Sequence, residues 1–176
     1  PIPVDEYGKP LYDKMKGTFV WGKNVVPELR WSNGKWNRMM INTNEGFSST
    51  PVQLGTPVGD IGDPTAKLYP FKKMVGNQPA DAVNNTMLVP HLFGKIGGPN
   101  PYWVAYDWNL ALEDGAAYTG QAYSGDYTFV DTEMYLSVNH EIAPSEQARS
   151  CSSCHSATTG IDFIGLGFPS NPNPMP

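Results

Sequence analysis

Two cysteines and one histidine stand within five residues near the end of the chain, as Cys151, Cys154 and His155. On a helix, residues three and four positions apart project from the same face, so the three side chains would point the same way. This spacing suits two thioether bonds to the edge of a porphyrin, with the imidazole reaching the iron from one side. The chain has only two cysteines and three histidines in all. The pattern therefore predicts one covalently bound haem c, held by these three residues, with His155 as an iron ligand.

Two other chemistries use closely spaced cysteines. A thioredoxin-like redox pair belongs in a βαβ unit, and no such pattern precedes Cys151. A zinc site could combine both cysteines with His140 or His91, but such sites normally place the second ligand pair at a short spacing as well. Haem attachment is the favoured interpretation.

The second axial ligand of the iron must come from elsewhere in the chain. Methionine raises the reduction potential of a haem and histidine lowers it, and both types are present. His140 is the first candidate, because the turn at Pro144 could fold it back over the haem. A hydrogen-bonded histidine without metal is the other interpretation of His140. His91 is the alternative ligand, for this haem or for a haem of another segment or chain. Met134 and Met87 are weaker candidates, because methionine often fills cores.

The elements that would position these residues are short. Asn33-Gly34 between the apolar runs 29–31 and 36–41 predicts a β-hairpin, and 19–21 is a further β-type run. Segment 44–67 is typical of a long loop, and Pro70 favours an edge position for 67–74. Helices are expected over 81–88, from the N-cap Asp107 to Ala117, and from Pro144 into the cysteines.

Composition indicates a loop-rich fold that is nevertheless ordered. The chain has 18 glycines and 17 prolines, but also 5 tryptophans, 9 tyrosines and 7 phenylalanines. Disordered chains are poor in such rings. We expect a mostly irregular, small α+β fold, with a few short helices and a β-hairpin organised around the haem. Residues 1–168 would form a single haem-binding cytochrome domain, and 169–176 a flexible tail.

Charge and hydropathy exclude several classes of partner. The formal net charge is −5, unlike the basic surface of a nucleic-acid binder. The sequence shows neither an apolar run of about 18 residues nor a signal peptide, so no membrane span is expected. A start at Pro1 suggests processing or truncation. Because haem c is attached outside the cytoplasm, we expect a periplasmic or extracellular location.

Several further motifs resemble the C-terminal part of octahaem tetrathionate-reductase-like cytochromes. They are WSNG (31–34), AKLYPFK (66–72), GNQPAD (76–81), PHLFG (90–94), YSG (123–125), FVDTEMY (129–135) and Asn139-His140 with Pro144, leading into the cysteine motif. The resemblance implies an exported multihaem electron-transfer protein with closely spaced haems, mostly held by two histidines, and it supports His140 as an iron ligand. The remaining haems and the substrate-binding haem of that family have no counterpart in this sequence.

These observations favour a c-type cytochrome that transfers electrons within a multihaem chain or complex. Its partners would be other redox proteins or haem-bearing chains, in a homo- or hetero-oligomer. One alternative is a haem-dependent reductase of a small sulfur or nitrogen oxyanion, with an open iron position and Lys72, Lys73 or Arg149 attracting the anion; those cations would otherwise form an ordinary solvated surface. Another is a structural subunit of a cytochrome assembly.

Overall fold

The computed structural model describes residues 2–13, 17–18, 22, 25–41, 44–94, 100–139, 144–158 and 160–174. The statements below concern these residues. The β-type run expected at 19–21 lies outside them, and so does His140.

A five-stranded sheet is the largest element of the fold. Its strands are β3 (Glu28–Ser32), β4 (Trp36–Arg38), β5 (Val52–Pro57), β6 (Lys67–Asp81) and β7 (Tyr127–Ser137), in the order β3-β6-β7-β5-β4. Strands β6 and β7 pair antiparallel from Phe71↔Ser137 to Asp81↔Tyr127, and β5 joins β7 in parallel. A separate pair is formed by β1 (Tyr12–Asp13) and β2 (Gly17–Thr18).

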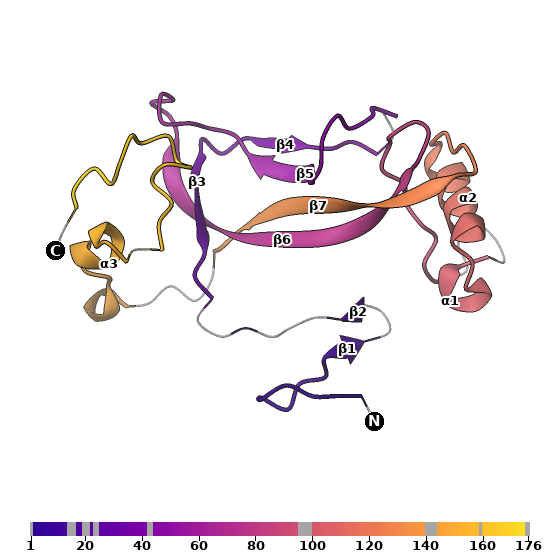
Figure 1. Ribbon diagram of the computed structural model, residues 1–176, viewed down its shortest axis with the longest axis horizontal. Helices are drawn as coiled ribbons and strands as arrows, with labels where there is room; N and C mark the ends of the chain where they lie inside the picture. The colour runs from indigo at the N-terminus through magenta and orange to yellow at the C-terminus, as the bar shows by residue number, and fades with distance from the viewer. Residues whose placement is uncertain are drawn as a thin grey trace.

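The helices are short and lie at the two ends of this sheet. At one end are α1 (Tyr102–Ala105) and α2 (Trp108–Thr119), and at the other is α3 (Cys151–His155), as Figure 1 shows. The 3₁₀ helix η1 (Ser145–Gln147) precedes α3. The carboxylate of Asp107 accepts a hydrogen bond from the N–H of Leu110, which confirms the predicted N-cap. The small α+β class expected from the sequence is also confirmed.

The predicted hairpin around Asn33-Gly34 is wrong in its strand pairing. Strand β3 pairs with β6, whereas β4 pairs with β5, at the opposite side of the strand order. The turn itself forms, with Gly34 at φ 85° and the N–H of Lys35 bonded to the side chain of Asn33. However, Asn33 is held by the neighbouring loop through Val58 O and the carboxylate of Asp63. The sequence therefore predicted the turn correctly, because a turn depends on neighbouring residues, but it did not predict which strands pair.

Three further expectations are corrected. Segment 81–88 is the end of β6 followed by a turn, not a helix. Strand β6 lies between β3 and β7 rather than at an edge. The carbonyl of Pro70 accepts from the N–H of Val138, just beyond the end of β7, so the missing N–H of Pro70 removes a bond at the end of this ladder and not one within it. The helix expected from Pro144 into the cysteines is interrupted at Ala148, whose ψ is 141°.

The turn after β6 is organised by one buried carboxylate. Asp81 is fully buried and accepts hydrogen bonds from the N–H groups of Val83, Asn84 and Ser124, and from the Ser124 hydroxyl. Burial by itself raises the pKa of Asp81, but these donors outweigh it and the pKa lies below its ordinary value. The charged form of Asp81 is therefore the one that stabilises the fold.

We predict that Asp81→Asn destabilises the protein by about 2–3 kcal/mol at neutral pH, because an amide N–H₂ would then face donors in a buried site. A group with a depressed folded pKa contributes stability above its unfolded pKa and loses it as the pH falls through the folded value. The difference in stability between the two proteins should therefore begin to shrink below about pH 4 and shrink further as the pH falls through the folded pKa of Asp81. Urea unfolding at pH 7 and at pH 3 measures both effects.

The matched control is Asp131→Asn, because Asp131 is exposed and its carboxylate accepts from the side chain of Asn77. Equal losses of stability for the two variants at pH 7 would contradict the role given to Asp81.

Candidate haem-attachment site

The short helix α3 carries all three residues of the predicted attachment motif. Cys151, Cys154 and His155 lie on one turn and a half of helix, so the helical spacing assumed from the sequence is present. Both cysteines are free thiols; Cys151 is exposed, and Cys154 and His155 are half-buried. Two thiols and an imidazole are thus presented together at the surface, where a porphyrin edge can reach them.

The imidazole of His155 is oriented by two residues from the described segment 160–174, called the C-terminal segment below. Its Nδ1 lies 3.0 Å from Asn171 Oδ1, and the Asn171 amide donates to the His155 carbonyl at 2.7 Å. The ring also stacks on Phe163, with centroids 5.5 Å apart and planes at 19°. Since Asn171 Oδ1 is only an acceptor, Nδ1 carries the proton and Nε2 keeps its lone pair. That is the state an iron ligand needs.

Sequence reasoning did not identify Asn171. It lies within the segment 169–176 that we expected to be a tail, and its type and spacing give no signal for a contact with His155. Its role is visible only because the chain turns back onto α3.

The C-terminal segment also ties α3 to the sheet. The indole N–H of Trp31 in β3 donates to the Leu166 carbonyl at 2.8 Å. Phe168 lies between Trp31 and Phe163, with ring centroids 6.2 Å and 5.8 Å away, and both Phe163 and Leu166 are buried. A continuous series of rings therefore connects the imidazole of His155 to an edge strand of the sheet.

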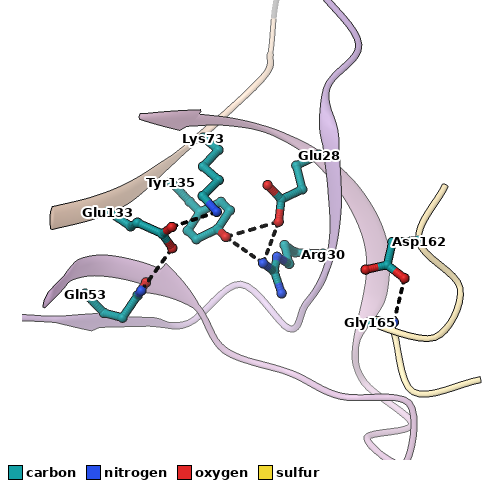
Figure 2. A network of polar contacts seen from close by, with 8 residues as sticks. All are labelled: Glu28, Arg30, Gln53, Lys73, Glu133, Tyr135, Asp162 and Gly165. Atoms are coloured by element: carbon teal, nitrogen blue, oxygen red, sulfur yellow. Dashed lines mark hydrogen bonds and ion pairs between the residues drawn. The ribbon is translucent and has the colours of Figure 1, made fainter. Parts of the chain in front are cut away.

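A cavity of about 460 Å³ lies beside this junction. Figure 2 shows the polar network at its wall, in which Arg30 donates to Tyr135 at 2.6 Å and pairs with Glu28 at 2.5 Å. The Asp162 carboxylate, in the segment that follows α3, accepts from the N–H of Gly165 at 2.8 Å. The cavity wall is thus built partly by the segment that supports His155.

Lys73, one of the cations considered for anion binding, belongs to the same network. Its ammonium lies 2.7 Å from Glu133, which also accepts from Gln53 at 3.0 Å. These hydrogen bonds hold the pKa of Glu133 below its ordinary value, and the carboxylate raises the pKa of Lys73. The charge of Lys73 is therefore already balanced.

Two of the other candidate ligands, His91 and Met87, are not brought to α3. The backbone of His91 bonds Ala111 in α2 and Tyr102 in α1, and these two helices lie at the opposite end of β6 and β7 from α3 (Figure 1). Met87 is buried in the core with Val52 and Ala80. Among the described residues, no three His, Cys, Asp or Glu side chains are grouped to hold a metal ion. A zinc site that uses His91 with the two cysteines is therefore not formed.

Comparison with known proteins agrees with the chemistry of α3. Residues 2–158 match the family described as bacterial cytochrome c. The chain belongs to this family. Among solved structures, an octaheme cytochrome c from Shewanella oneidensis matches with a TM-score of 0.84 and 41% identity, over 98% of this chain and 40% of that one. A search of curated proteins gives no match.

As a member of this family, the protein is a c-type cytochrome, a class of protein that holds its haem covalently. The resemblance to octahaem cytochromes seen in the sequence is confirmed at the level of the family. The cytochrome spans less than half the length of the octaheme protein that it matches. Among its described helices, none has the length and apolar character needed to cross a membrane.

We predict that Asn171→Ala weakens binding of the haem iron by His155, the expected axial ligand, about 10-fold or more, because the ring loses the acceptor that orients it. Protons compete with iron for Nε2, so a 10-fold weaker bond raises the midpoint of acid-induced ligand loss by about one pH unit. A visible-absorption titration of the ferric protein measures this midpoint.

Asn173→Ala is the control, because only its backbone N–H bonds Asn171 and its side chain is exposed. An unchanged midpoint for Asn171→Ala would show that the contact does not support the ligand.

Proposed function

We propose that this cytochrome binds one haem c through thioethers to Cys151 and Cys154, with His155 as the first axial ligand, and relays electrons within a multihaem array. The observation that carries the proposal is that His155 shares one short helix with two free thiols. Its Nδ1 lies 3.0 Å from Oδ1 of Asn171, a residue of the segment that follows the helix. When bound, the haem supplies a one-electron iron couple. The protein sets its potential through ligand basicity and burial.

We further propose His140 as the second axial ligand. The residue before it is anchored, since the side chain of Asn139 accepts from Tyr69 OH at 2.7 Å and donates to Ser137 at 3.0 Å. Strand β7 ends at Ser137, η1 begins five positions after His140, and α3 begins eleven positions after it. In sequence, His140 therefore stands between an anchored residue and the attachment helix.

The surroundings favour electron relay over catalysis. Two axial histidines leave no iron position for a substrate, and Lys73, the cation of the cavity network that was considered for anion binding, is paired with Glu133. The aromatic series from His155 to Trp31 limits solvent access on one side of the helix, which helps to set the potential. No observation favours oxyanion reduction.

The size of the related octaheme protein supports a multihaem setting. The chain corresponds to 40% of that protein, so further haems would be supplied by another part of the same polypeptide or by partner chains. Attachment of haem c outside the cytoplasm supports a periplasmic or extracellular location.

The attachment residues can be tested by mass. In a host that matures cytochromes c, the denatured protein should have the mass of the polypeptide plus one haem, and its pyridine haemochrome should show two thioethers. Cys151→Ala or Cys154→Ala should leave one thioether, and the double variant should lose covalent haem. Ser152→Ala, between the cysteines, should retain full attachment. An unmodified mass for the parent protein would refute the proposal.

The second ligand can be tested separately. We predict that His140→Ala converts the resting ferric haem from low spin to high spin and opens it to cyanide, because one axial position is vacated. Electron paramagnetic resonance measures the spin state. His91→Ala, the control, should leave this haem low spin. A low-spin spectrum in His140→Ala would assign the position to another residue.

A further inference from the structure

His91 is held in place by its main chain as well as its side chain. Its N–H donates to the Ala111 carbonyl at 2.9 Å, and its carbonyl accepts from Tyr102 at 2.8 Å. Gly115 permits this close approach, because a Cβ there would lie 1.8 Å from the Val89 carbonyl oxygen and 3.1 Å from the His91 nitrogen. The position of His91 between α1 and α2 is therefore tightly defined.

The side chain of His91 is prepared as a lone-pair donor. Its Nδ1 lies 2.9 Å from the Asp114 carboxylate, which holds the proton on that nitrogen. The side chain is only 10% exposed, and its Nε2 is buried with no hydrogen-bond partner among the described residues. A buried polar atom without a partner costs about 1–3 kcal/mol, so such an atom calls for a function.

A metal that needs only one ligand from this chain fits the site. Zinc sites take three or four protein ligands, and no such group exists among the described residues. A haem iron already holds the four porphyrin nitrogens and an axial ligand of its own, so it needs one imidazole more. The surrounding apolar surface agrees, since Phe93, Val104 and Tyr106 are exposed by 56%, 69% and 70%. They belong to α1, to its C-cap and to the segment after His91, and the N–H of Trp103 in α1 donates to the carbonyl of Leu92 in that segment.

This haem cannot be the one attached to α3. Helix α3 is tied through Leu166 to Trp31, which pairs with Leu68 near the start of β6. His91 follows the other end of β6, where Leu88 N–H bonds Pro79. The paired stretch between Phe71 and Asp81 alone has a contour of about 34 Å at the usual rise per residue. The two histidines therefore serve different sites.

We propose that His91 is the distal axial ligand of a second haem, one that is covalently attached to a polypeptide outside this sequence and docks on the α1–α2 end. Asp114 is its positioning residue. The inference rests on the proposed relay function and adds a second point of electron entry or exit, at the opposite end of the sheet from α3. Because Nε2 is buried, docking displaces neighbouring side chains.

The test uses the mature haem-bearing protein and, as a probe, a short Cys-x-x-Cys-His peptide carrying haem c with one axial histidine. Adding protein to the ferric probe should convert the probe to a low-spin, two-histidine spectrum in a saturable manner. His91→Gln, which keeps a donor for Asp114 but offers no imidazole, should weaken binding at least 10-fold. Asp114→Asn should weaken it about 10-fold or more by releasing the ring.

His140→Ala separates this proposal from the preceding one. It should alter the protein's own haem and leave probe binding unchanged, while His91→Gln should leave the denatured mass and the protein's own spectrum unchanged. Thermal melting checks that the variants fold. Equal probe binding by the parent and His91→Gln would overturn the proposal. A low-spin change that appears without the probe, when the protein concentration alone is raised, would also overturn it. The haem bound by His91 would then be that of a second copy of this protein.

Discussion

The antiparallel pairing of β6 with β7 is the interaction on which the rest of the structure depends. It aligns eleven residues of each strand, from Phe71↔Ser137 to Asp81↔Tyr127. Each end carries a different attachment: α3 and the C-terminal segment at one, and the α1–α2 pair at the other (Figure 1). A rigid ladder of this length keeps His155 and His91 at opposite ends of the sheet, which is the arrangement that the proposed relay between two haems requires.

The two histidines share one chemical arrangement despite their distance. In each, an oxygen acceptor lies close to Nδ1: Asn171 at 3.0 Å from His155 and Asp114 at 2.9 Å from His91. Each imidazole then offers Nε2 as a lone-pair donor. The difference in acceptor has a consequence, because a carboxylate makes the imidazole a stronger electron donor than a neutral amide does, and a more basic ligand favours the ferric state.

The many aromatic rings of the chain are also divided between the two ends of the sheet. One group of rings, Phe163, Phe168 and Trp31, supports His155. Another lies around α1 and α2, where Tyr102 and Trp108 stack with centroids 4.2 Å apart and Trp108 meets Phe129. Between them, Phe71 is almost fully buried against Trp36 and Tyr135 within the sheet. The rings thus build the sheet core as well as the surroundings of both histidines, so the aromatic content alone did not indicate how many sites to expect.

Features that depend on near neighbours in sequence could be predicted from the sequence alone. The helical spacing of Cys151, Cys154 and His155, the cap at Asp107 and the turn at Gly34 all follow from contacts within a few residues, and the structure has each of them. Features that join distant residues could not be predicted. The separate partners of β3 and β4, the acceptors Asn171 and Asp114, and the distance of His91 from α3 arise only when the sheet is assembled. Local backbone chemistry limits conformation, whereas the choice among distant partners depends on which packing buries the most apolar surface and leaves the fewest polar groups unpaired.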